Sequence, residues 1–331
     1  MRTSIRVNND LSDEELTQLV LAAEAVGVDQ VWISHDLMLR SAPVLVGALA
    51  ARTERIQLGI GIMNPYTVHP TEIAMVAATA QEISGGRFLL GLGAGAIDFL
   101  AWAGLERRRP MTTTRQSVAA LRALLGHDDV SEEDLPDWWG ESSFLRFAIP
   151  RPVPVYVGAM GPQMRRLAGR VADGALPLLS RPEMFTEARG DVLAGVHDSG
   201  RDAARFDLPA CVWVSLGDRA EARRVMAEKL AYYGPSLSEV QLAPAGLEPA
   251  DFQPAADLAR AGDLDAAVAL IDDRMLSLGI AGSPDEVTAR CLELRALGAE
   301  HISFGPPLGP DPATAIELLG REVIPALRAA R

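Results

Sequence analysis

The sequence predicts an α/β protein with the fold of a (β/α)8 barrel, the TIM barrel. Short apolar segments alternate with amphipathic helical segments along most of the chain, as parallel strands and their covering helices do. Eight apolar segments fit a strand, and glycine-rich loops directly follow several of them. The 331 residues exceed a usual domain of ~100–200 residues, but single barrels routinely pass ~250. Because the loops after the strands form the active-site face of such a barrel, a site is expected there.

The first two strand–helix cycles are clear in the N-terminal sequence. A strand is predicted over residues 2–7, and Ser12 precedes the next helix and forms a capping-box pattern with Glu15 three residues later. A second strand is predicted over residues 30–33, and a helix over residues 44–51 follows it.

Residues 55–96 form the most informative stretch. A strand over 55–60, a helix over 70–83 and a strand over 88–92 make one strand–helix–strand unit, and a loop of small residues follows each strand. Glycine lacks the Cβ that would keep a flat ligand or a phosphate away from the backbone. These loops therefore indicate a binding site, with tight turns in an ordinary α/β fold as the alternative.

The second half is less regular. A helix is predicted over residues 112–125, and the acidic segment 127–143 is interpreted as an excursion over the barrel surface, with its two tryptophans packing against the body or contacting substrate. Residues 218–275 are helical and polar, which predicts a helical insertion, at about 218–280, between strands seven and eight of a single domain spanning 1–331. The remaining strands are predicted over residues 152–159, 173–178, 209–215 and 301–304.

One loop has the features of an anion site. Gly158 and Gly161 precede Pro162, which suits the first turn of a helix. The unpaired N–H groups and the dipole at a helix N-terminus both favour a phosphate.

The composition argues against several classes of binding partner. A net charge of −13 argues against nucleic acid and anionic membranes, which reward basic patches. The two cysteines, Cys211 and Cys291, are interpreted as buried thiols and not as a disulfide or a metal pair, and no metal site is predicted. No apolar run approaches the ~18 residues of a membrane span, so a cytoplasmic protein is expected. Lys229, the only lysine, is interpreted as a sign of genomic bias.

Several motifs together resemble the bacterial luciferase-like superfamily. Within it, the chain is most similar to the branch that uses the deazaflavin coenzyme F420, in particular the methylene-tetrahydromethanopterin reductases. The resemblance covers nearly the whole chain. The motifs that carry it are residues 59–70 (GIGIMNPYTVHP), 84–87 (SGGR), 91–95 (GLGAG), 156–162 (YVGAMGP), 172–174 (ADG), 280–285 (IAGSPD) and 305–310 (GPPLGP).

The resemblance implies roles for individual residues. A non-prolyl cis peptide that supports the flavin-like ring would join Gly61 and Ile62. His35 would lie near the ring as a catalytic residue, with a hydrogen-bonded loop histidine as the alternative. The ring site would be lined by Asn64, Gly93 and Gly95, and the cofactor phosphate would be bound by Gly158, Ala159, Met160 and Gly161.

Two departures from the reductase pattern concern the substrate. A glutamate on strand one and an aspartate in the loop after strand four are replaced here by Arg6 and Ala96. Two carboxylates suited to acid–base work or to holding a pterin are therefore missing. The hypothesis is that the cofactor scaffold is retained while the substrate has changed, with Arg6 facing an anionic group of that substrate.

The resemblance implies an oxidoreductase that moves a hydride between C5 of coenzyme F420 and a small organic substrate such as a pterin. One alternative is an FMN-dependent monooxygenase of the same superfamily. A second alternative, from another class, is a non-catalytic barrel that binds a flavin or has lost its ligand. A homodimer or higher homo-oligomer is expected by analogy.

Overall fold

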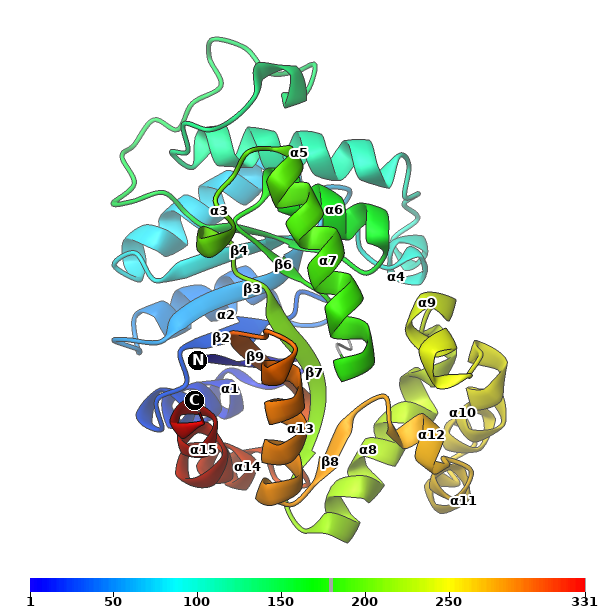
Figure 1. The fold of residues 1–331 in the computed structure, drawn as a ribbon. Helices are drawn as coiled ribbons and strands as arrows, with labels where there is room; N and C mark the ends of the chain where they lie inside the picture. Colours follow the sequence, from blue (N-terminus) through cyan, green and yellow to red (C-terminus); the bar gives the residue numbers. More distant parts are fainter. Residues whose placement is uncertain (179–180, 331) are drawn as a thin grey trace.

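Nine parallel strands form one sheet in the order β6-β5-β4-β3-β2-β1-β9-β7-β8, in a computed structural model that describes residues 1–178 and 181–330 (Figure 1). The strands are β1 (Arg2–Val7), β2 (Gln30–Ile33), β3 (Gln57–Met63), β4 (Phe88–Leu92), β5 (Val155–Gly158), β6 (Gly174–Leu176), β7 (Pro209–Leu216), β8 (Ile280–Gly282) and β9 (His301–Leu308).

The sheet curls until β6 meets the segment before β7. Gly174 and Asp207 form a parallel bridge, and the Ala175 N–H donates to the Asp207 carbonyl at 3.1 Å. The predicted α/β barrel is confirmed. The sequence did not predict β8, which pairs with the C-terminal half of β7, from Val214 to Leu216. Its three residues are too short for a recognisable strand pattern.

Helices cover the outside of the sheet. The predicted capping box is present at the start of α1, where Ser12 and Glu15 bond each other's backbone. The helices are α1 (Asp13–Ala25), α2 (Ala42–Ala50), α3 (Pro70–Ile83), α4 (Ile97–Trp102), α5 (Pro110–Leu124), α6 (Pro162–Val171), α7 (Pro182–Asp198), α8 (Arg219–Tyr233), α9 (Glu239–Leu242), α10 (Gln253–Arg260), α11 (Leu264–Ala269), α12 (Asp273–Leu276), α13 (Pro284–Ala296), α14 (Pro312–Leu318) and α15 (Ile324–Ala329). None of those described is both long and apolar enough to cross a membrane.

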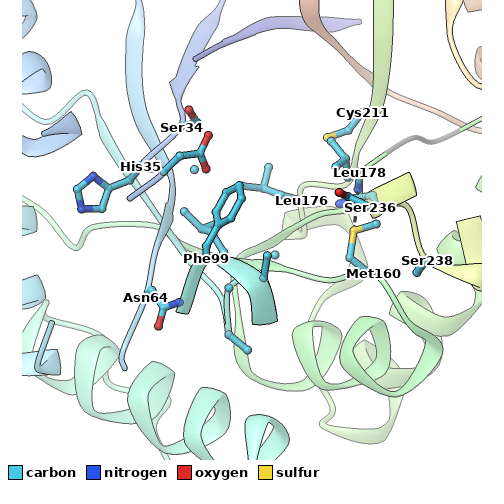
Figure 2. A pocket seen from close by; sticks show the side chains of 18 of the residues that line it. Ser34, His35, Asn64, Phe99, Met160, Leu176, Leu178, Cys211, Ser236 and Ser238 are labelled. Carbon is cyan, nitrogen blue, oxygen red and sulfur yellow. Dashed lines mark hydrogen bonds between the residues drawn. The ribbon is translucent and has the colours of Figure 1, made fainter. Parts of the chain in front are cut away.

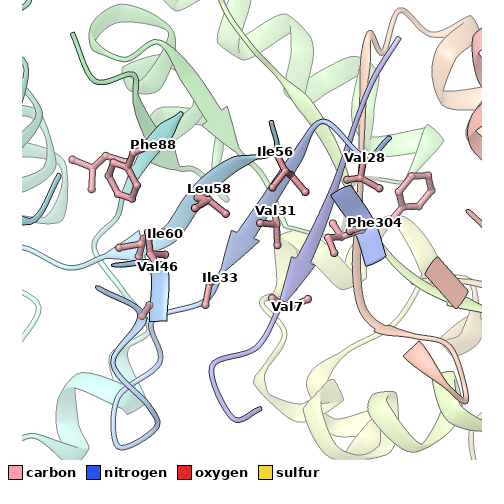
Figure 3. Packing of buried hydrophobic residues seen from close by; sticks show 14 of the residues in the cluster. Val7, Val28, Val31, Ile33, Val46, Ile56, Leu58, Ile60, Phe88 and Phe304 are labelled. Carbon is pink, nitrogen blue, oxygen red and sulfur yellow. The ribbon is translucent and has the colours of Figure 1, made fainter. Parts of the chain in front are cut away.

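The main core lies between the strands and the helices. Alternate strand residues, such as Val31 and Ile33 on β2 and Leu58 and Ile60 on β3, are fully buried and pack near Val46 of α2 (Figure 3). The alternation follows from the two-residue period of a strand, which sends the intervening side chains into the barrel.

The barrel interior contains a small aromatic layer. Trp32 and Tyr156 meet edge to face, with ring centroids 4.9 Å apart at 70°. Glycines on the neighbouring strands make room for the rings, because a Cβ at Gly59 would overlap Trp32 and a Cβ at Gly174 would overlap Tyr156. Trp32 also lines the cavity described below, so this layer supports it from beneath.

A buried polar network lies at the amino ends of the strands. Asp207 lies 3.0 Å from Nδ1 of His301, accepts a hydrogen bond from the Tyr156 hydroxyl at 2.8 Å and pairs with Arg2 at 2.9 Å. The Nε2 atom of His301 lies 2.8 Å from the Ser4 hydroxyl. Burial alone would raise the pKa of Asp207, but His301 and Arg2 together with these hydrogen bonds lower it to about 2.

Helices α8 to α12 gather on one side of the barrel (Figure 1). They share a second hydrophobic cluster, in which Met226, Leu230 and Phe252 are fully buried and Trp213 of β7 joins them.

The fold also bears on the two cysteines and on the two tryptophans of segment 127–143. Both cysteines are free and buried, as expected. Trp139 packs against the main core, and Trp138 lies against the His69 ring with centroids 4.8 Å apart. Neither tryptophan lines the cavity, which favours packing over substrate contact.

Candidate active site

A cavity of about 930 Å³ lies at the carboxyl ends of the barrel strands. Residues of β1, β3, β5, β6 and β7, the loops after β2 and β4, and helix α8 line it. In Figure 2, His35, Asn64 and Phe99 lie at one side of the view and Met160, Leu178 and Cys211 at the other. This is the face on which a barrel is expected to carry its site.

The end of β3 has the backbone feature that the resemblance implies. The peptide bond between Gly61 and Ile62 is cis, and the pairing of β3 with β4 shifts register between Ile60 and Met63. Gly61 and Ile62 both line the cavity. A Cβ at Gly93 would overlap the Ile62 side chain, so a residue without a side chain is needed there.

Two of the predicted cofactor residues are buried beside the cavity and do not line it. Gly93 donates its N–H to the Met63 carbonyl at 3.0 Å. Ala159 is fully buried in the main core and donates its N–H to the Leu176 carbonyl at 3.3 Å. Both positions therefore hold the wall in place from behind.

Asn64 and Gly95 meet at the edge of the cavity. The Asn64 side-chain oxygen accepts a hydrogen bond from the Tyr66 N–H at 2.8 Å. Gly95 has a φ of +71°, which favours glycine, and a Cβ there would overlap the Asn64 amide nitrogen. Arg107 donates to the Gly95 carbonyl at 3.0 Å. The loop after β4 is thus shaped around Asn64.

The loop between β5 and α6 leaves backbone open to the cavity. Gly158, Met160 and Gly161 line the cavity, and Gly161 is the N-cap of α6 with Pro162 at the first helical position. A Cβ at Gly161 would meet no atom within 4 Å among the described residues. The first-turn N–H groups of a helix have no partner within it, so this end of α6 suits an anion.

His35 and Asp36 follow β2 and line the cavity. Nδ1 of His35 accepts the Ala42 N–H at 3.4 Å, so the neutral ring carries its proton on Nε2. Burial lowers the pKa of His35 and raises the pKa of Asp36, because each loses solvation of its charged form.

Arg6 of β1 lies in the cavity wall. Its Nη2 donates to the Val212 carbonyl of β7 at 2.8 Å, and the guanidinium crosses β9 at Gly305, where a Cβ would overlap it. Burial lowers the pKa of Arg6. Ala96, at the second departure from the reductase pattern, also lines the cavity and is the N-cap residue of α4.

Sequence reasoning missed the contribution of α8. Lys229 lines the cavity, with its Nζ 4.6 Å from the Trp213 ring centroid and 4.4 Å from that of Tyr233. Burial, and then the charge of Arg6, lower the pKa of Lys229 to about 8, while Asp10 and Asp36 oppose the shift. Lys229 is the only lysine of the sequence, and this was the one sequence signal that could have identified it as a site residue.

The fold and the cavity are those of an α/β barrel with its binding site at the carboxyl ends of the strands. Residues 4–301 match the family described as luciferase-like monooxygenase, and the chain belongs to this family.

Individual relatives are more specific. The chain is 34% identical over 306 residues to the 5,10-methylenetetrahydromethanopterin reductase of Methanolobus tindarius, covering 91% of this chain and 93% of the relative. It is 30% identical over 334 residues to the F420-dependent glucose-6-phosphate dehydrogenase of Nakamurella multipartita, covering 95% and 93%.

Solved structures agree. The coenzyme F420-dependent tetrahydromethanopterin reductase from Methanopyrus kandleri superposes with a TM-score of 0.85 at 28% identity, covering 98% of each chain. An F420-dependent secondary alcohol dehydrogenase, solved with an F420–acetone adduct, shares the fold with a TM-score of 0.77 at 22% identity, covering 99% of this chain and 100% of that one.

Proposed function

We propose that this protein is a coenzyme F420-dependent oxidoreductase that transfers a hydride between the deazaflavin and a small organic substrate. The observation that carries the proposal is the cavity of about 930 Å³, open to exposed backbone at the N-terminus of α6. Two similar proteins that are named for F420 dependence, the glucose-6-phosphate dehydrogenase and the Methanopyrus kandleri reductase, match more than nine-tenths of the chain and support this choice of cofactor.

The residues present fit a deazaflavin with a phosphate. Apolar side chains that suit the faces of a flat ring, Ile62, Phe99 and Leu176, line the cavity. The phosphate would be held by backbone N–H groups of Met160 and Gly161, where the dipole of α6 favours negative charge. A ring and a small substrate together fit a cavity of this volume.

The deazaflavin, when bound, supplies hydride chemistry at C5. The chain positions the ring and the substrate and supplies a proton to the substrate. His35 is the candidate catalytic residue, because Ala42 occupies Nδ1 and leaves the proton on Nε2 available to a substrate heteroatom. Ile62 and the Asn64–Gly95 contact hold the wall on which a ring would rest.

Titration of the purified protein with coenzyme F420 and, separately, with FMN tests the proposal, with absorbance and fluorescence as readouts. Micromolar binding of F420 with little affinity for FMN is expected. A preference for FMN would instead indicate an FMN-dependent, oxygen-activating monooxygenase of the family. Binding of neither would support a barrel without a flavin-type cofactor and overturn the proposal.

Hydride transfer needs its own assay, because binding alone does not distinguish an enzyme from a non-catalytic barrel. Reduced F420 should be oxidised under anaerobic conditions in the presence of imines, enones or pterins. The His35→Gln variant should bind F420 as the wild type does while turnover falls by about 10²–10⁴-fold, the usual contribution of general acid–base catalysis. The resemblance also implies a homodimer. Size-exclusion chromatography with light scattering on the eluted protein tests this oligomeric state.

A further inference from the structure

Two cations line the same part of the cavity without a carboxylate partner. Within residues 1–178 and 181–330, neither Arg6 nor Lys229 forms an ion pair, and the only hydrogen bond of the Arg6 guanidinium is the one to Val212. A guanidinium carries five N–H donors, so Arg6 retains donors for a ligand. Its Nε is closed off from solvent and has no protein partner.

Buried arginines elsewhere in this protein are compensated. Arg122 pairs with Asp129 at 2.5 Å, and Arg165 pairs with Asp191 at 2.7 Å. Burying a charge without a partner is costly, and removing one partner of a buried pair costs ~3–5 kcal/mol. An arginine kept unpaired in a cavity wall therefore indicates a partner that arrives with a ligand.

The wall around Arg6 is built to hold it. Gly305 provides the space through which the side chain reaches from β1 across β9 to β7, because a Cβ there would overlap the guanidinium. The Val212 carbonyl fixes the far end. Its planar fork is suited to the bidentate recognition of a carboxylate or a phosphate.

Lys229 is held in the same region by two aromatic rings. The rings of Trp213 and Tyr233 lie within 4.6 Å of its Nζ, which stabilises the ammonium by cation–π interaction without neutralising it. Like Arg6, it enters from the side of the barrel formed by β1, β9 and β7, since α8 directly follows β7. Two like charges close together repel each other, and an anion between them would remove that repulsion.

We propose that Arg6 and Lys229 together bind an anionic group of the substrate, a carboxylate or a phosphate, so that the substrate is an organic anion. This assignment rests on the proposed oxidoreductase function. The pair comes from β1 and α8, whereas the loop proposed for the cofactor phosphate follows β5, so the two anion positions share no residue.

Calorimetric titration with inorganic phosphate and, separately, with acetate tests the pair. The variants are Arg6→Gln and Lys229→Met. The control is Arg224→Gln, which removes a charge from the same helix at a residue that pairs with Glu228 and Asp265 outside the cavity. F420 binding is measured on every variant in parallel.

Saturable binding of at least one anion is expected, with a loss of at least tenfold in both cavity variants and no change in the control. Phosphate binding that both cavity variants lose, without acetate binding, would identify a phosphate ester as the substrate class, and acetate binding alone a carboxylate. Unchanged anion affinity in either cavity variant, or no saturable binding to the wild type, would overturn the inference.

The two proposals fail separately. Normal F420 binding without anion binding would leave the proposed function and remove the anionic substrate. Anion binding without F420 binding would refute the proposed function and with it the assignment of the anion to a substrate.

Discussion

Replacing Asp207 with asparagine removes the carboxylate that joins His301, Tyr156 and Arg2 at the amino ends of the strands. The side chain of Asp207 is 12% exposed, so its charge is little screened by solvent. The lowered pKa of about 2, against an ordinary value of 3.8, measures how strongly the folded state favours the charged form. At 1.36 kcal/mol per pKa unit, this preference stabilises the fold by about 2.5 kcal/mol at pH 7.

The sign of the pH dependence follows from the lowered pKa. The folded state holds this carboxylate deprotonated to a lower pH than the unfolded chain does, so the stabilisation is fully present above about pH 4. It is lost as the pH falls towards about 2, and roughly half remains at pH 3. The Asp207→Asn variant, which has no charge to lose, should approach the wild type over this range.

Urea unfolding of both proteins, followed by tryptophan fluorescence at pH 7 and pH 3, measures the difference. We expect Asp207→Asn to be less stable by about 2.5 kcal/mol at pH 7 and by about half as much at pH 3. The control is Asp265→Asn, whose exposed ion pair with Arg224 should contribute less than about 1 kcal/mol. Equal stability of Asp207→Asn and the wild type at pH 7, or a difference that does not shrink in acid, would refute this reasoning.

Three further outcomes are expected. Gly93→Ala places a methyl group against Ile62, so the variant should lose ~1–3 kcal/mol of stability in a thermal melt and bind F420 more weakly. Gly161→Ala, which has open space at its Cβ, is the control and should melt as the wild type does. Gly305→Ala should displace the guanidinium that crosses β9 and weaken anion binding in calorimetry while leaving F420 affinity intact. Acetate affinity should fall up to about tenfold between pH 7 and pH 9 as Lys229, with a pKa of about 8, loses its proton, and a persistent fall in Lys229→Arg would point to another group.

The barrel was predictable because its signals are local. The strand–helix alternation and the glycines in β3 and at the carboxyl ends of β4 and β5 lie within short windows of sequence, and strand polarity then brings the loops after these strands to one face. The cis bond at Gly61 came from the family resemblance, since nothing in the local sequence distinguishes it from a trans bond.

The parts of the site that escaped prediction depend on contacts between distant segments. Lys229 lies in a polar helix, and only the folded chain places it beside Trp213 and in the cavity with Arg6. Gly93 and Ala159 belong to the expected loops, yet each bonds the backbone of a neighbouring strand directly after its own strand ends, and neither lines the cavity. Spacing identifies a loop, whereas the direction of a residue depends on register, which a short glycine-rich segment leaves open.

The space at Gly305 has a consequence for how this cavity can change. A guanidinium at position 6 reaches β7 only where position 305 carries no side chain, so the residues at the two positions are not independent. A chain that acquired the arginine first would have to crowd it against a Cβ. A chain that acquired the glycine first would meet no such clash. The arginine can therefore enter this cavity wall without a steric clash if the glycine at position 305 is already present, and not in the opposite order. Gly305 is thus the permissive substitution.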